Sequence, residues 1–264
     1  MNITRDITNI EPHVFFSFLG LDIADSTIFI FGILIFMIIT GFLIRKYFSV
    51  LPSKLQVAIE VAFEASHDLI GNIINDEEKT KKAFPVIGAI MLYILIANVV
   101  GLLPGVEQLS FGGHGILRTP TSDFNTTFGL ALGAVVIINL IAIKEKGIIS
   151  YLGQFFPFHL IWKGFKKGIG AGCIAVIEFF IGLLDIIGEV VKVVSLSLRL
   201  FGNMYAGQIL MVIMFGFIAF VVPALWLAMS LFVGVLQAIV FAALVASYYM
   251  LATTTTEVSE ETQH

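Results

Sequence analysis

The chain has 264 residues, of which 58% are hydrophobic and 13% are charged. Its mean hydropathy of +0.98 excludes an ordinary soluble globular domain and indicates an integral membrane protein. The formal net charge of −4 argues against a nucleic-acid partner. The first residues lack the basic and apolar regions of a signal peptide, so we expect the first apolar run to be retained.

Long apolar runs predict membrane-embedded helices, because a bilayer crossing needs about 20 predominantly apolar residues. Short connections and the absence of an internal repeat indicate one membrane domain with an all-α fold of about five membrane-embedded helices and one surface helix. The expected order is an outer N-terminal segment over 1–25, a first transmembrane helix over 26–47, an amphipathic surface helix over 54–75, a transmembrane hairpin over 83–143 with an outer loop at 104–123, a long helical hairpin over 169–252, and a cytoplasmic tail over 253–264.

The segment from Lys54 differs from the other helices because its polar residues follow one stripe. Glu60, Glu64, His67 and Gly71 lie along one side of a helix at this spacing, while apolar residues fill most of the rest. This pattern is typical of an amphipathic helix that lies on the membrane surface.

The apolar run over 169–222 is too long for one upright crossing. As a single helix it would reach about 80 Å at about 1.5 Å per residue, whereas the hydrocarbon core is about 30 Å thick. The run must therefore tilt steeply, bend, or form two helices. Gly182, Gly188 and Gly202 are the positions where a bend is expected.

Basic residues set the expected orientation, because Lys and Arg accumulate on the cytoplasmic side. If the segment after the first span is cytoplasmic, only Arg5 and Arg118 lie outside, and the N-terminus is outside while the C-terminus is inside. The basic residues expected in the cytoplasm are Arg45, Lys46, Lys54, Lys79, Lys81, Lys82, Lys144, Lys146, Lys163, Lys166 and Lys167.

A stripe of charged residues runs through the long apolar segment. Counting back from Arg199 by sevens gives Lys192, Asp185 and Glu178, which form one gently winding stripe because seven residues are nearly two turns. Together with Glu189 beside the stripe, these are five ionisable groups. If they faced lipid they would cost on the order of 12 kcal/mol, so the stripe must face water or protein. Three further polar residues lie on or beside this stripe: Ser195, Asn203 and Glu189.

Three interpretations of this stripe compete. The first is ion pairing within the helix bundle, with Lys192 bound to Asp185 or Glu189. Arg199 has Ser195 and Asn203 as expected hydrogen-bond partners but no acid within one turn, which leaves its charge to be explained. The second interpretation is a stand-alone transporter that binds an anionic substrate at Arg199. The third is an ion conduit in which Arg199, which cannot pass on a proton, is a fixed electrostatic gate.

The sequence resembles subunit a of F-type ATP synthases, the membrane stator subunit beside the rotating c-ring. The stretch "SLSLRLFGNMYAGQ" around Arg199 is the most specific match. Three more stretches agree in order, namely "NVVGLLPG" from Asn98, "PTSDFNTTFGLALG" from Pro120 and "LQAIVFAALVASYYM" from Leu236. The resemblance runs from the first span to Met250.

The resemblance implies a role for each matching residue. Arg199 corresponds to the family's essential arginine, which keeps two aqueous half-channels apart and releases the proton from each arriving c-ring carboxylate. Asp185 is similar to the acidic residue of the cytoplasmic half-channel. Residues with supporting roles on these helices are Glu189, Lys192, Ser195, Asn203 and Gln237, and the charged stripe adds Glu178 to the half-channel candidates.

The sequence departs from the family in the outer half-channel. Many bacterial members have a Glu nine residues after the arginine and a His seven before the glutamine, where this chain has Gln208 and Ser230. No Asp, Glu, His, Lys or Arg occurs from Leu200 to Thr256. The remaining candidates at the channel mouth are Glu107, His114 and Asp123, each of which is expected to be a solvated loop residue. Asn125, Asn203, Gln208, Ser230 and Gln237 are alternatives that could line a water wire or bind sodium through neutral oxygens.

Together these features predict a proton-conducting stator subunit of a rotary ATP synthase in the bacterial inner membrane. We expect no active site, cofactor or metal site in this chain, since the histidines have no metal-ligand spacing. The expected partners are the c-ring, the peripheral-stalk b subunits and membrane lipid. A sodium-translocating version of the same subunit remains open, as does, less favoured, the stand-alone transporter.

Overall fold

The computed structural model describes residues 14–18, 21–48, 52–102, 110–111, 114–115, 119–148, 151, 169–215 and 221–254. Its elements, in chain order, are β1 (Val14–Phe18), β2 (Leu21–Ala24), α2 (Asp25–Tyr47), α3 (Lys54–Ile74), α4 (Glu77–Gly101), β3 (Ser110–Phe111), β4 (His114–Gly115), the short 3-10 helix η1 (Pro120–Ser122), α5 (Phe124–Lys146), α8 (Ile169–Phe215) and α9 (Val221–Thr254).

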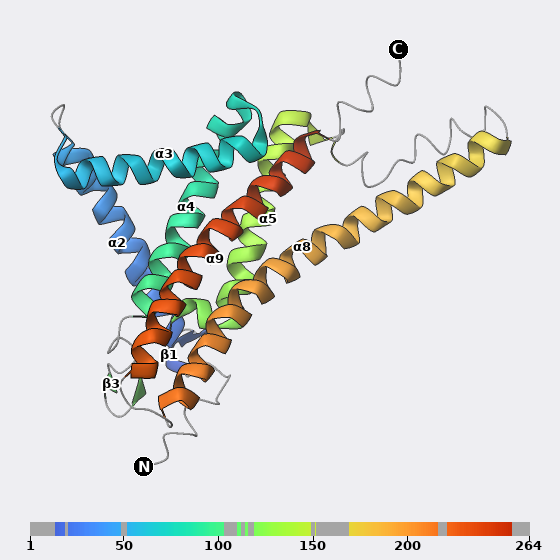
Figure 1. Ribbon diagram of the computed structural model, residues 1–264. Helices are drawn as coiled ribbons and strands as arrows, with labels where there is room; N and C mark the ends of the chain where they lie inside the picture. Colours follow the sequence, from blue (N-terminus) through green and yellow to red (C-terminus); the bar gives the residue numbers. More distant parts are fainter. Residues whose placement is uncertain are drawn as a thin grey trace.

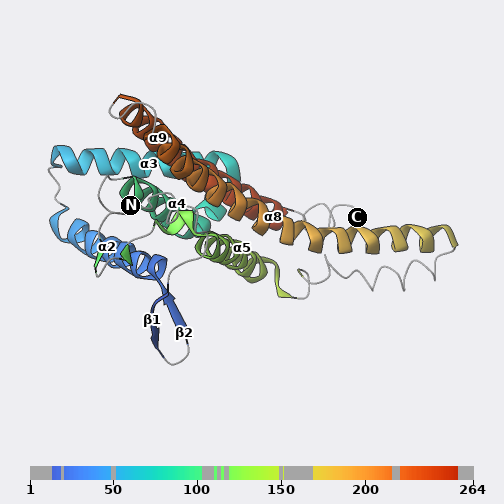
Figure 2. The same cartoon turned by 90° about the horizontal axis from the view of Figure 1, so that it is seen from below.

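The membrane-embedded part is entirely helical, as the sequence predicts. Four of the described helices are long and apolar enough to cross a bilayer: Ser26–Tyr47, Glu77–Gly101, Phe124–Lys146 and Ala224–Thr253. Helix α8, which the sequence also predicts to be membrane-embedded, is not among these four. Two short antiparallel hairpins, β1–β2 and β3–β4, are additions that the sequence analysis does not anticipate. The β1–β2 hairpin leads directly into α2 (Figure 2).

Helix α3 lies across the ends of α4 and α9, as expected for a surface helix (Figure 1). Ser53 caps its start by accepting a bond from the backbone of Gln56, and Asn75 ends it in the left-handed conformation at φ 54°. Asp76 then caps α4, accepting from the backbone N–H groups of Glu78 and Lys79, and the Lys79 bond holds the pKa of Asp76 below its ordinary value. A two-residue turn thus redirects the chain from the surface into the membrane, and α4 begins six residues earlier than the predicted span.

The core is built on a stripe of small residues along α9. Gly234, Ala238, Ala242 and Ala246 recur every fourth residue, and α9 packs mainly on α4 and also on α5, α3 and α8. The three alanines are fully buried. Small side chains let helix backbones approach closely, which is how helices associate where lipid removes the usual hydrophobic driving force.

Helix α8 is one uninterrupted helix of 47 residues. At about 1.5 Å per residue it is about 70 Å long, and it runs obliquely past α5 and α9, with its yellow N-terminal part extending beyond the other helices (Figure 1). The length of the run allowed a steep tilt, a bend or two helices. The structure has a single helix that is steeply tilted relative to the other helices (Figure 1). It has no break at Gly182, Gly188 or Gly202.

Candidate functional site

The charged stripe of α8 divides into two environments. Glu189 and Lys192 are half-buried where α8 packs on α5 and α9, whereas Asp185 and Arg199 are exposed. Glu178 lies in α8, but its side chain falls outside the described residues. The heptad spacing therefore places these residues along one edge of the helix without giving them the same surroundings.

Lys192 is paired with Glu189, which decides between the two partners that the sequence left open. The Lys192 ammonium donates to Oε1 of the Glu189 carboxylate, and Asn139 of α5 donates to Oε2 at 3.2 Å. Lys192 Nζ also lies 5.2 Å from the ring centroid of Tyr248 on α9. Neither Asn139 nor Tyr248 was predicted from the sequence as part of this site. Burial raises the pKa of Tyr151, and the nearby negative charge of Glu189 adds to the shift.

Arg199 makes no hydrogen bond or ion pair with any residue that the structure describes. The expected bonds to Ser195 and Asn203 are therefore wrong. All three side chains lie on α8, but Arg199 is exposed, whereas Ser195 and Asn203 are half-buried. Arg199 lines an open, mostly apolar groove formed by one face of α8, together with Val190, Val191, Val194, Ser195 and Leu198.

Gln237 lies in a buried polar contact between α9 and α4. The Asn98 amide donates to the carbonyl of Gly234 at 3.0 Å, and a Cβ added at Gly234 would lie 3.2 Å from Asn98 Cβ. One turn further along α9, Gln237 is 7% exposed, and its Nε2 has no partner among the described residues. Asn98 Oδ1 also lacks a partner there. Buried amide groups without a protein partner are typical positions for bound water.

Asp123 is buried, so its expected role as a solvated loop residue is wrong. Its side chain is 6% exposed and caps the start of α5 by accepting from the backbone N–H of Asn125 at 3.0 Å. Oδ2 accepts from the Ser26 hydroxyl at 2.7 Å and from Thr126 at 3.3 Å. The carboxylate is held by hydroxyl and amide donors of α2 and α5. This burial arises where η1 packs against both α2 and α5, a contact that the sequence does not reveal.

The other outer candidates differ in burial. Gln208 on α8 and Ser230 on α9 are half-buried, and the Asn125 side chain is exposed. Glu107 lies outside the described residues, and of His114 only the backbone in β4 is described. Between α5 and α8 the structure instead adds a hydroxyl pair that the sequence analysis missed, with Thr127 Oγ1 3.5 Å from Ser197 Oγ.

No three His, Cys, Asp or Glu side chains converge in a possible metal site within the described ranges. The polar clusters around Glu189 and Asp123 each contain a single carboxylate with amide, hydroxyl or ammonium partners. Such clusters can hold a charge in place and orient water. The arrangement suits ion conduction along helices better than covalent chemistry at a single centre.

The ATP synthase A chain family model matches residues 26–250. The chain belongs to this family. The match covers helices α2 to α9 except for Asp25 and the last turn of α9, and it includes Arg199, Gln208, Ser230 and Gln237.

Three curated relatives are similar to this chain over three quarters of its length or more. ATP synthase subunit a of Desulforamulus reducens is 31% identical over 75% of this chain and 66% of its own length. ATP synthase subunit a of Geotalea daltonii is 30% identical over 85% of this chain and 86% of its own length. A protein of Propionigenium modestum named "ATP synthase subunit a, sodium ion specific" is 29% identical over 87% of this chain and 74% of its own length.

Family membership confirms the resemblance drawn from the four sequence stretches. The chain is a non-catalytic membrane subunit of the ATP synthase type, and the family implies ion transport. Membership also argues against the stand-alone transporter, since all three of these relatives are named as subunits of an ATP synthase.

Proposed function

We propose that this chain is the proton-conducting stator subunit of a rotary ATP synthase. Two offset half-channels deliver protons to and from the carboxylates of the c-ring, and Arg199 is the electrostatic gate between them. Ion flow is thereby coupled to rotation of the ring. The subunit lies in the bacterial inner membrane with its N-terminus outside and its C-terminus in the cytoplasm.

The observation that carries this proposal is the unpartnered guanidinium of Arg199 on an exposed apolar face of α8. Among the described residues, Val190, Val194 and Leu198 share that face and are exposed. A charged side chain at the centre of a membrane helix that faces lipid costs about 2.5 to 3.5 kcal/mol. We therefore expect this face of α8 to contact a protein partner as well as lipid. A carboxylate presented by a partner helix would neutralise Arg199 while the apolar side chains pack against that helix.

The half-channels follow from the polar residues on either side of this gate. In the cytoplasmic half-channel we place Asp185, which is exposed and without a partner among the described residues, together with Ser195 and the Glu189–Lys192 pair. Buried amide groups that lack protein partners in the described part of the chain favour a water-lined outer half-channel. The residues assigned to this outer half-channel are Asp123, Asn125, Asn203, Gln208, Ser230 and Gln237. Glu178 is assigned to the cytoplasmic side.

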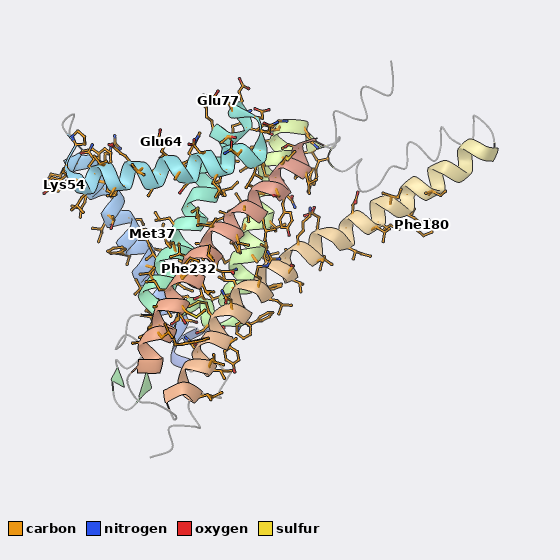
Figure 3. The ribbon with its side chains drawn as sticks, viewed as in Figure 1. Met37, Lys54, Glu64, Glu77, Phe180 and Phe232 are labelled. Carbon is orange, nitrogen blue, oxygen red and sulfur yellow. The ribbon has the colours of Figure 1, made fainter. Side chains whose placement is uncertain are left out.

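Two further partners follow from the exposed surfaces. Apolar residues of α8 and α9 such as Phe180 and Phe232, labelled in Figure 3, are exposed and would meet the c-ring or lipid. The acidic side of α3, represented by Glu64 in Figure 3, is exposed above the membrane-embedded helices and is where we place the peripheral-stalk b subunits.

Substitution of the gate tests the proposal directly. In inverted membrane vesicles, Arg199→Ala should abolish ATP-driven ion pumping while the subunit still assembles with the ring. Lys81→Ala, which removes an exposed cation paired with Glu77 at the start of α4, is the matched control and should pump normally. Substantial coupled pumping by assembled Arg199→Ala would disprove the gate.

Sodium is the second candidate ion, because a relative named as sodium ion specific aligns with most of the chain. The outer polar residues on α8 and α9, namely Asn203, Gln208, Ser230 and Gln237, offer neutral oxygen ligands, which suit a hard cation. The test is ATP-driven pumping across pH, with and without sodium. Sodium stimulation at high pH, with sodium protecting the ring carboxylate from carbodiimide, would replace protons by sodium and leave the rotary proposal intact.

A further inference from the structure

Helix α8 has two cations, Lys192 and Arg199, and their surroundings are opposite. Lys192 is half-buried and paired with Glu189, whereas Arg199 is exposed and without a partner among the described residues. The two residues are seven positions apart on the same edge of the helix, which separates them by about 10 Å along its axis. The gate therefore has a neighbouring charge of the same sign, and that charge is compensated.

The compensation is built from three helices. Glu189 Oε1 accepts from Lys192, and its Oε2 accepts from Asn139 of α5 at 3.2 Å. Tyr248 of α9 places its ring 5.2 Å from Lys192 Nζ. The side chains of Glu189 and Lys192 are each 23% exposed. Both oxygens of the carboxylate and the ammonium therefore have protein partners, which come from α5, α8 and α9.

We propose that Glu189 is a positioning residue that neutralises Lys192, so that Arg199 is the only uncompensated cation that the described part of α8 presents to the ring carboxylate. The inference rests on the proposed gate at Arg199 and adds the requirement that the charge of Lys192 be neutralised. Asp185, the nearest exposed acid on α8, is left without a partner among the described residues by this arrangement and stays available to the cytoplasmic path.

The physical reason is competition between two attractive charges. A ring carboxylate that moves along α8 is drawn to each bare cation, and the attraction is strong where low-dielectric surroundings replace water. An unpaired Lys192 would offer a second resting position about 10 Å from Arg199, so the carboxylate would dwell away from the gate. A paired cation has a much weaker field at that distance, because the carboxylate beside it cancels most of its charge.

A set of four variants in the complete ATP synthase tests this account. We expect Glu189→Gln to reduce ATP-driven ion pumping by about tenfold, because it leaves the charge of Lys192 uncompensated. Glu189→Gln combined with Lys192→Gln should restore pumping to the level of Lys192→Gln alone. Glu189→Asp, which keeps the charge, should retain most of the pumping. All rates are normalised to the amount of subunit and ring in the membrane.

A reversed pair separates charge from packing if Glu189→Gln does not assemble. Glu189→Lys combined with Lys192→Glu keeps the pair neutral and should pump at half or more of the level of Lys192→Gln. A combined Glu189→Gln and Lys192→Gln variant as slow as Glu189→Gln alone would overturn the inference, as would an assembled reversed pair that does not pump. Unimpaired pumping by Glu189→Gln would overturn it too.

Failure of the gate itself has a different signature. If Arg199→Gln pumps normally, the proposed function is wrong whatever the Glu189 variants do. If Arg199→Gln is inactive but removal of Lys192 does not rescue Glu189→Gln, only the charge compensation is wrong. The two hypotheses are thus read from separate variants in the same vesicle assay.

Discussion

Tyr249 near the end of α9 donates a hydrogen bond to Glu145 near the end of α5, with 3.0 Å between the phenol oxygen and Oε1. Lys82 of α4 lies 3.4 Å from the same carboxylate oxygen. The Tyr249 side chain is fully buried, although its partner belongs to a charged stretch that sequence analysis assigns to the cytoplasmic loop. This contact joins α4, α5 and α9 at the end of the bundle where α9 packs on α3 (Figure 1).

Removing the Tyr249 hydroxyl should destabilise the bundle. Tyr249→Phe keeps the ring but removes a bond to a charged acceptor, which is worth about 2 kcal/mol. We expect a lower thermal unfolding midpoint for this subunit in the purified complex in detergent. Its unfolding is measured by its sensitivity to protease as the temperature rises. Tyr47→Phe is the matched control, because that side chain is 71% exposed. Equal midpoints for the two variants would show that the buried bond contributes nothing measurable.

Gly101 is required by the close approach of α4 to the segment before α5. A Cβ at this position would lie 2.3 Å from Cγ2 of the buried Thr119, so Gly101→Ala should reduce the amount of assembled subunit. Gly129→Ala in α5 is the control, since a Cβ there meets nothing within 4 Å and alanine favours a helix by about 0.5 to 1 kcal/mol over glycine. Adding Thr119→Ala to Gly101→Ala should recover most of the loss. A Gly101→Ala variant that assembles normally would contradict the packing argument.

Asp185 and Lys192 should differ in their effect on conduction. Asp185 is exposed without a partner among the described residues, whereas Lys192 is paired, so Asp185→Ala should slow ion conduction more than Lys192→Ala does. The measurement is passive proton conduction through the membrane sector after removal of the catalytic subunits. Small, equal effects would mean that the stripe serves ion pairing and not the exit path.

The outer half-channel should accept an added carboxylate. Gln208 is half-buried on α8, and a carboxylate beside a water-lined path can be hydrated, whereas one enclosed by hydrocarbon is costly. We therefore expect Gln208→Glu to pump and to introduce a pH dependence that the original chain lacks. Pumping rates of both chains between acidic and alkaline pH measure this. Complete loss of pumping at every pH would argue against a hydrated path at this position.

Lysine should not replace the gate arginine. Arg199→Lys keeps a positive charge but loses the planar donor fork, and an ammonium loses its proton more readily when desolvated. We expect ATP-driven pumping to fall by about tenfold or more while assembly is unchanged. Pumping by Arg199→Lys at the original rate would show that any cation suffices, which would weaken the case for a permanent charge.

Local features of the amino-acid sequence were sufficient to predict the membrane fold, the order of the helices and the family. These features are runs of apolar residues about 20 long, the polar stripe of α3, and a specific motif around Arg199. The length of the run from 169 also required a steep tilt, a bend or a break, because one upright helix of that length does not fit the bilayer.

Which polar residues meet depends instead on how the helices pack. Heptad spacing predicted that Asp185 and Lys192 lie on one edge of α8. In the structure, where α8 packs on α5 and α9, Lys192 pairs with Glu189. Asn139 of α5 and Tyr248 of α9 complete this site. The burial of Asp123 likewise depends on Ser26, 97 residues away in the chain. Such pairings depend on how helices distant in sequence pack on one another. The periodicity within a single helix shows which residues share a face but not which residues of other helices contact that face.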